Sequence, residues 1–383
     1  MAIERPLHRL SLDDLRARTS AKWRRYDPDV LPLWVAEMDV VLADPIREAL
    51  EHAVRIGDTG YPVGTAYPES FVDFARARWD WAGLTVDNVR PVSAVIQGYT
   101  EALLLAAGPG GTVVVTSPVY PPFYSYVREA GLTVIEAPLG ADMRLDLDQI
   151  DSVLGGAVTG GAPGVALLLC NPHNPGGTLH TRDELSALAT VVSAHGATVV
   201  SDEIHAPLTY APGTFTPYLS VDPTAMALHA ASKAWNLAAI PAALLVFGEE
   251  AADARRAFAG GAHHGPTHFG ALAQTAAYRE GGPWLDALLV DLADNRDLLA
   301  RLLAEHVPGA RLTPLESTYL AWVDCRELGL EADPASVFLE RGRVAFNPGP
   351  TFGTGGAGHV RVNIATHPAI LTEAVQRMAA ALA

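Results

Sequence analysis

The chain has 383 residues, of which 49% are apolar, and it carries a formal net charge of −16. This length suits one large domain plus a smaller one, and the apolar fraction is enough to bury a sizeable core. Because a surface this acidic repels phosphodiester backbones and anionic lipid, we expect neither nucleic acid nor a membrane as a partner. No apolar run reaches the roughly 20 residues of a membrane span, and the amino terminus lacks the apolar run of a signal peptide, which predicts a cytoplasmic location.

Short apolar runs alternate with helical patterns through the middle of the chain. Residues 181–194, for example, repeat leucine and valine at helical spacing. The runs that we expect to form buried strands are Val113–Thr116, Val165–Leu169, Thr198–Ser201 and Leu244–Phe247. This alternation predicts an α/β fold with a large, doubly wound, mostly parallel sheet covered by helices on both faces.

The pattern changes near Pro283. Trp284–His306 is a long helical pattern without glycine or proline, and short strand-like runs follow at Tyr319–Asp324 and His359–Ile364. We predict a large domain over residues 41–283 and a smaller α/β domain over residues 284–383, with residues 1–40 packed against the smaller one. Ligands of doubly wound sheets bind beyond the carboxyl ends of the strands, so the loops that follow the strands are the positions to inspect.

Three of these loops carry polar side chains. Asn171 and Asn174 lie in an Asn-Pro-His-Asn-Pro-Gly-Gly segment, which on turn chemistry alone is equally consistent with an ordinary rigid turn. Asp202 ends a predicted buried strand, where an acid is costly unless a cation meets it; a structural helix cap is the other interpretation. Lys233 follows Ser232 in the third loop, and a lone Ser-Lys pair carries little information by itself.

Taken together, the three loops resemble the class I/II aminotransferases, which are fold-type I pyridoxal-phosphate (PLP) enzymes. Asp202 follows Asn174 by 28 residues, Lys233 follows Asp202 by 31, and Arg361 follows Lys233 by 128. The resemblance covers nearly the whole chain, and further matching segments are Thr59–Pro62, Ile96–Gly98, Ser317–Leu320 and Asn347–Gly349.

Two other segments, Trp34–Asp39 and Pro118–Phe123, resemble the cystathionine β-lyase or cysteine-S-conjugate β-lyase branch of that family. Typical aminotransferases place a phosphate-binding arginine about eight residues after the lysine, where this chain has Pro241, and many have serine at the position of Ala230. The missing arginine fits the lyase branch. The resemblance implies a carbon–sulfur lyase that converts cystathionine or another S-substituted cysteine to a thiol, pyruvate and ammonia. An aminotransferase is the alternative, and a PLP-binding regulatory protein a third, although no DNA-binding helix pair or basic patch is evident.

The resemblance also implies the roles of the residues around PLP. Lys233 would form the internal Schiff base and then act as the base that removes the Cα proton of the substrate. Asp202 would pair with the pyridine nitrogen, and Asn174 would donate to the phenolic oxygen. His205 would either contact the same oxygen or be an ordinary core histidine. Tyr120 would stack on the ring; a buried core tyrosine is the alternative.

The phosphate and the substrate carboxylate need further donors. Gly98, Tyr99 and Thr100 follow a strand-like run and open a helical pattern, which suits phosphate binding at a helix start, with Ser232 as a hydroxyl contact. By resemblance, Tyr61 reaches the phosphate from a neighbouring subunit and counts among the catalytic residues, which implies a homodimer with shared active sites. Arg361 would clamp the substrate α-carboxylate, with Ala36 and Asn174 beside it.

We predict no metal site. His263, His264 and His268 cluster, but no carboxylate or cysteine lies nearby in the sequence to complete a ligand set. By resemblance this stretch enters a helix near the cofactor, where it would contact the substrate side chain. Cys170 and Cys325 lie far apart without a CxxC companion, which argues against a disulfide framework and a structural zinc site.

Overall fold

The computed structural model describes residues 5–259 and 265–383. The chain divides into two compact units. The larger unit comprises Leu42–His173 and Leu179–Gly282, and the smaller comprises Met1–Val41, Asn174–Thr178 and Pro283–Ala383. Within the described residues no helix is long and apolar enough to cross a membrane.

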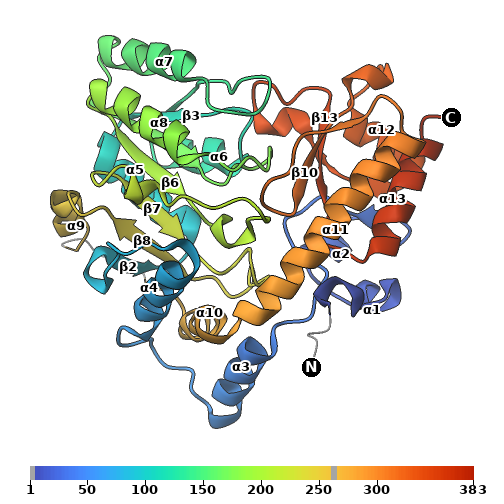
Figure 1. Cartoon of the computed structure of the whole chain (residues 1–383), viewed down its shortest axis with the longest axis horizontal. Helices are drawn as coiled ribbons and strands as arrows, with labels where there is room; N and C mark the ends of the chain where they lie inside the picture. Colours follow the sequence, from blue (N-terminus) through green and yellow to red (C-terminus); the bar gives the residue numbers. More distant parts are fainter. Residues whose placement is uncertain (1–4, 260–264) are drawn as a thin grey trace. The chain divides into compact units, whose positions relative to one another are not determined.

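A seven-stranded sheet forms the centre of the larger unit, in the strand order β2-β8-β7-β6-β5-β3-β4 (Figure 1). Its strands are β2 (Val89–Val92), β3 (Thr112–Val115), β4 (Thr133–Glu136), β5 (Val165–Cys170), β6 (Thr198–Asp202), β7 (Met226–His229) and β8 (Ala243–Phe247). Strands β3 to β7 are mutually parallel, whereas β8 is antiparallel to both of its neighbours. The predicted doubly wound, mostly parallel sheet is therefore confirmed.

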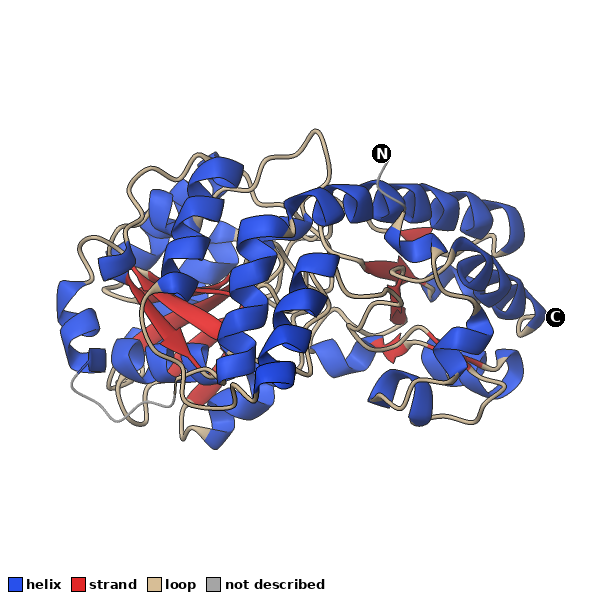
Figure 2. Ribbon diagram, turned by 90° about the horizontal axis from the view of Figure 1, so that it is seen from below, coloured by secondary structure: helices blue, strands red, loops and turns tan. Residues whose placement is uncertain are grey.

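Helices cover both faces of this sheet (Figure 2). The helices of the larger unit are α3 (Asp44–Ile56), α4 (Ala66–Trp79), α5 (Val95–Ala107), α6 (Pro122–Glu129), α7 (Leu147–Thr159), α8 (Arg182–Ala194), α9 (Ala252–Ala259) and α10 (His268–Glu280), with short 3-10 turns η2 (Val86–Asn88), η3 (Ala206–Leu208) and η4 (Tyr218–Ser220). Helix α8 shows why such segments are helical. Thr181 and Glu184 form a capping box at its start, and the leucines and valine at helical spacing are buried.

Alternation along the strands determines which side chains face α5. Ala166, Leu168 and Cys170 of β5 belong to one buried cluster with Tyr99 and Leu103 of α5. Val200 of β6 belongs to the same cluster. Because side chains two residues apart point to the same face of a strand, Asp202 lies on the α5 side of the sheet.

The smaller unit contains a four-stranded antiparallel sheet, β12-β13-β10-β9, and a parallel pair, β1 with β11. Its strands are β1 (Leu31–Pro32), β9 (Arg311–Leu312), β10 (Leu320–Asp324), β11 (Val344–Ala345), β12 (Asn347–Pro348) and β13 (His359–Asn363). Its helices are α1 (Leu12–Arg16), α2 (Ala21–Arg24), α11 (Gly282–His306), α12 (Pro334–Gly342) and α13 (Pro368–Ala380), with 3-10 turns η1 (Pro6–His8), η5 (Arg326–Leu328) and η6 (Gly349–Phe352). The β1–β11 pairing ties the amino-terminal segment into this unit.

Candidate active site

The carboxyl ends of the parallel strands meet at one edge of the large sheet. From β3 the chain continues to β4 on one side, while β5, β6 and β7 lie on the other, so a topological switch point falls between β3 and β5. Ligands of open α/β sheets bind at such a point. The loops that follow β3, β5 and β7 carry three of the predicted cofactor residues, Tyr120, Asn174 and Lys233, and a fourth, Asp202, ends β6.

Asp202 is the last residue of β6 and only 4% exposed. Burial raises the pKa of its carboxyl group to about 7, against the lowering effects of a hydrogen bond from the Ile204 N–H (3.2 Å) and of the charge on Lys233. The structure thus brings Asp202 and Lys233 within electrostatic reach of each other. A buried acid that is costly to ionise is well suited to a site where a bound cation would meet it.

The loop that carries Lys233 is held by Gln274, a fully buried side chain on α10. Its Oε1 accepts from the Ala231 N–H at 2.9 Å and from the Tyr67 hydroxyl at 2.7 Å, and its Nε2 donates to Ser232 Oγ at 3.3 Å. Gln274 was not predicted from the sequence. It lies more than 40 residues from the loop, and no local pattern marks it.

The helix predicted to open at residues 98–100 begins earlier, which corrects the assignment of the phosphate donors. Helix α5 begins at Val95, and the Gly98 N–H already donates to Ala94 C=O. The amides of Tyr99 and Thr100 therefore lie inside the helix, where the backbone uses them, and Thr100 Oγ1 donates back to Ile96 C=O at 2.8 Å. The open N–H groups at this terminus belong to residues 95–97.

The side chain of Tyr99 is fully buried in the core that α5 forms with the sheet, and its hydroxyl donates to Pro122 C=O at 3.4 Å. Tyr120, by contrast, is half-buried in the loop after β3, with its ring edge-on to Phe123. His205 is 3% exposed and lies just before η3.

Tyr61 lies in the loop between α3 and α4 with 97% of its surface exposed. Its ring is therefore not part of the buried strand-end cluster of its own chain.

In the smaller unit the structure brings Arg361, Asn174 and Trp34 together. Arg361 lies on β13 and is 3% exposed. Its Nη1 donates to Asn174 Oδ1 and its Nη2 to Trp34 C=O, each at 3.1 Å, and its guanidinium lies 5.0 Å from the ring centre of Phe352. The planar fork is held in one orientation by these contacts, as a carboxylate clamp requires.

The segment that contains Ala36 is fixed through its carbonyl groups. Tyr319 donates its hydroxyl to Ala36 C=O at 3.1 Å, and Asn363 Nδ2 donates to Val35 and Glu37 C=O at 2.7 Å each. Lys22 Nζ donates to Glu37 C=O at 3.0 Å. The predicted substrate segment thus has a defined conformation beside Arg361.

His263 and His264 lie outside the described residues. His268 Nε2 lies 2.9 Å from Asp58 Oδ2, a carboxylate 210 positions away that the sequence did not reveal as a neighbour. Among the described residues no group of three or more potential metal ligands occurs.

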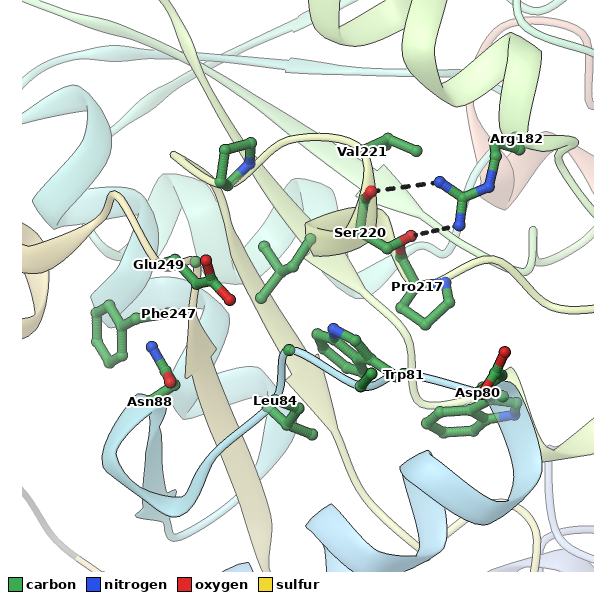
Figure 3. A pocket seen from close by; sticks show the side chains of 16 residues that line it. Asp80, Trp81, Leu84, Asn88, Arg182, Pro217, Ser220, Val221, Phe247 and Glu249 are labelled. Carbon is green, nitrogen blue, oxygen red and sulfur yellow. Dashed lines mark hydrogen bonds between the residues drawn. The ribbon is translucent and has the colours of Figure 1, made fainter.

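A cavity of about 370 Å³ lies elsewhere in the larger unit (Figure 3). It is lined by Trp81, Pro223 and Glu249 among others, and Arg182 reaches across its rim to Ser220. Pro223 precedes β7 and Glu249 follows the antiparallel strand β8. The cavity is therefore at the opposite edge of the sheet from the loops that follow β5, β6 and β7.

The fold is that of the fold-type I PLP enzymes. A solved structure from Corynebacterium diphtheriae, described as a "putative plp-dependent beta-cystathionase", shows this likeness. It superposes with a TM-score of 0.90 at 32% identity, covering 98% of this chain and 99% of that one. The family model "Aminotransferase class I and II" matches residues 29–378, and the chain belongs to this family.

Two relatives narrow the comparison to one branch. A Mycobacterium leprae protein named "Putative cystathionine beta-lyase" is 48% identical, with 98% of each chain covered. The "Cystathionine beta-lyase" of Corynebacterium glutamicum is 33% identical, over 97% of this chain and 99% of that protein. The resemblance drawn from Trp34–Asp39 and Pro118–Phe123 is confirmed.

Proposed function

We propose that the chain is a PLP-dependent carbon–sulfur β-lyase that converts cystathionine or another S-substituted cysteine to a thiol, pyruvate and ammonia. The observation that carries this proposal is the near-full-length similarity to proteins named cystathionine β-lyase. The structure supports it with a buried acid, Asp202, and a lysine, Lys233, at the edge of the sheet where the parallel strands end. We also propose a cytoplasmic location; Cys170 and Cys325 are buried thiols, and neither forms a disulfide within the described residues.

The residues at this edge fit the cofactor. Asp202 is a buried carboxylate that a pyridinium nitrogen would neutralise, and it lies beside the charge of Lys233. The open N–H groups of residues 95–97 and the Ser232 hydroxyl provide donors for a phosphate. When bound, PLP would supply the electron sink that makes the Cα–H bond of an amino acid acidic.

The chain's own groups would then bind and orient the substrate. We assign covalent attachment of the cofactor and proton removal at the substrate Cα to Lys233. Arg361 would hold the α-carboxylate, with Asn174 and the Ala36 segment fixing the direction of its fork. Tyr120, half-buried in the loop after β3, would cover one face of the ring. A thiolate on Cβ leaves readily, because a thiol has a pKa near 8.5.

An aminotransferase remains the second candidate, because the family also contains relatives named aminotransferase, such as one from Petunia hybrida at 26% identity. The experiment supplies cystathionine without a keto acid, and separately an amino donor with 2-oxoglutarate. We expect thiol and pyruvate in equal amounts over many turnovers from cystathionine alone. Turnover that stops after one equivalent and resumes only on addition of a keto acid would identify an aminotransferase.

We further propose a homodimer with shared active sites. Apolar side chains that a lone chain leaves in water gather at the end of α3 and in the loop after it: Val54 is 67% exposed, Ile56 61%, Tyr61 97% and Val63 96%. A second copy covering them would remove this surface from water. By resemblance, Tyr61 would contact the cofactor phosphate in the active site of the neighbouring subunit.

Mixing tests the shared site. Chains with Tyr61→Ala and chains with Lys233→Ala should each be inactive. After subunit exchange, verified by size and mass, each mixed dimer should regain one site with both intact residues. A mixture that stays inactive despite exchange would show that each chain builds its own site.

A further inference from the structure

One buried acid next to the site has no part in the reaction as assigned above. Glu203 follows Asp202 directly, and its side chain is 0% exposed. Its Oε1 accepts three hydrogen bonds, from Ser201 Oγ at 3.0 Å, Asn171 Nδ2 at 3.2 Å and the Tyr218 N–H at 2.8 Å. Each carboxylate oxygen has about two lone-pair sites, so three donors saturate this oxygen.

The other oxygen of Glu203 faces the next strand. Oε2 lies 3.1 Å from Nε2 of His229, the last residue of β7. That distance suits an ion pair, although the contact is not aligned as a hydrogen bond. The His229 ring is surrounded by Phe71, Trp79 and Trp81, with ring centres 4.7, 5.7 and 5.8 Å away.

These contacts connect the three loops of the candidate site. Asn171 directly follows β5 and precedes Asn174 by three residues, and its N–H also donates to Asp202 C=O at 3.0 Å. His229 precedes Lys233 by four residues. Glu203 therefore contacts residues that lie three positions before Asn174 and four before Lys233, and it directly follows Asp202.

Stability alone is a poor reason for this arrangement. Removing a carboxylate from water is expensive, and buried ion pairs can often be replaced by apolar side chains without loss of stability. Glu203 also carries its negative charge next to Asp202, where it raises the pKa of that carboxyl group further. A costly group that contacts residues close to Asn174, Asp202 and Lys233 is better explained by what it does to the site.

We infer that Glu203 is a positioning residue, whose buried carboxylate sets the spacing of the loops after β5, β6 and β7 and so prepares the cofactor site before PLP binds. This inference rests on the proposed site of PLP. It concerns a residue that does not touch the reacting atoms, so its effect must be read from cofactor binding as well as from activity.

The test compares Glu203→Gln with a matched variant. Glutamine keeps the shape and the accepting oxygen but removes the charge and its pairing with His229. Glu249→Gln makes the same chemical change at an exposed position on the opposite edge of the sheet. Two quantities are measured on folded protein: the dissociation constant of PLP from the apoprotein, and the pH midpoint of the visible absorbance of the bound cofactor.

For Glu203→Gln we expect PLP to bind about tenfold more weakly. The pH midpoint should move to lower pH, because a negative charge near the protonated form has been lost. Glu249→Gln should match the wild type in both. A wild-type value of either quantity in Glu203→Gln overturns the inference, whatever happens to the melting temperature. If that variant does not fold, the dissociation constant of PLP is measured for His229→Gln, which removes the contact with Oε2, and a wild-type value there overturns the inference.

Failure of the proposed site is distinguishable from failure of this inference. Borohydride reduction followed by peptide mapping shows which lysine holds PLP. If the label is on Lys233 and Glu203→Gln behaves as wild type, only the positioning role is wrong. If the label is on another lysine, the proposed site itself is wrong.

Discussion

Arg361 donates from Nη1 to Oδ1 of Asn174 at 3.1 Å, although the two residues are 187 positions apart in the chain. A second nitrogen of the same guanidinium donates to Trp34 C=O. Both contacts are buried or nearly so, and they hold the planar group in one orientation. The cost of ordering a long side chain is therefore met during folding, and a substrate carboxylate would meet a clamp already in place.

Arg361→Lys tests whether Arg361 binds the substrate carboxylate. Lysine keeps the charge but has no planar fork, so it cannot hold Asn174, Trp34 C=O and a carboxylate together. We expect kcat/KM for cystathionine to fall by about 100-fold, mostly through KM, which corresponds to the loss of one or two charged hydrogen bonds. Steady-state kinetics measure this, with PLP content per chain as the control. An unchanged KM would show that Arg361 does not bind the substrate.

Asp202→Asn should change stability and activity in opposite directions. In the cofactor-free protein, burial raises the pKa of Asp202 from its ordinary value of 3.8 to about 7. Between these values the folded chain keeps a proton that the unfolded chain has released, so this group lowers stability as pH rises from about 4 to 7. Asparagine removes the effect.

The cofactor-free Asp202→Asn variant should therefore gain stability relative to wild type on going from pH 5 to pH 8, by on the order of 3 kcal/mol. Urea unfolding of both apoproteins at the two pH values measures the gain. Lyase activity should fall by about 100-fold or more, because an amide does not favour a protonated pyridine nitrogen. A difference in stability that does not change with pH would contradict the buried, protonated carboxyl group.

Sequence reasoning located the parts of the site that depend on chain order. Asp202 was found because it follows a predicted strand, whereas Lys233 was assigned through the resemblance to the aminotransferase family, since β7 was not predicted as a strand. The start of α5 was misplaced because Ala94, its N-cap, gives no side-chain cap and so no sequence signal. Gln274 and Glu203 were missed as supports because their partners lie on other elements, and only packing brings them together.

The ion pair under the substrate segment gives a prediction about stability. Lys22 Nζ lies 2.8 Å from Asp39 Oδ2, and both side chains are almost fully buried, at 0% and 1% exposure. Trp23 Nε1 donates to the same carboxylate at 3.0 Å. Removing one partner leaves the other charge buried without compensation.

Lys22→Met should therefore lower the free energy of unfolding by about 3–5 kcal/mol, as measured by urea titration. The matched control is Arg311→Met, whose ion pair with Glu327 at 2.8 Å is 69% and 59% exposed. That variant should change stability by less than about 1 kcal/mol. Equal effects in the two variants would mean that burial of the Lys22–Asp39 pair is not what gives it its importance.

Two buried histidines predict sensitivity to acid. Burial lowers the pKa of His173 to about 3 and that of His180 to about 4, and the charge of Arg144 adds to the lowering at His180. Their ring centres are 6.3 Å apart. Neither ring nitrogen of His180 has a hydrogen-bond partner in the part of the chain that the structure describes. The folded protein therefore has no means of stabilising a proton on this ring.

The direction of the pH effect follows from these values. Below pH 6.5 the unfolded chain binds a proton on His180, whereas the folded chain does not bind it until the pH falls to about 4. Stability from this group is complete above pH 6.5 and is lost as pH falls through that window, at roughly 1.4 kcal/mol per pH unit once well below 6.5. His173, whose pKa is also lowered by burial, contributes a second loss of stability as the pH falls.

His180→Phe keeps a planar ring of similar size and removes the titrating group. The free energy of unfolding should then fall less steeply between pH 5.5 and 4.5, by a slope that corresponds to about one proton. Urea titrations of the cofactor-free protein at several pH values give the slope. The matched control is the same substitution at the exposed position His52, which should leave the slope as in the wild type. If His180→Phe and His52→Phe lose stability with the same slope as the wild type, His180 is protonated in the folded protein, and the burial argument for its low pKa fails.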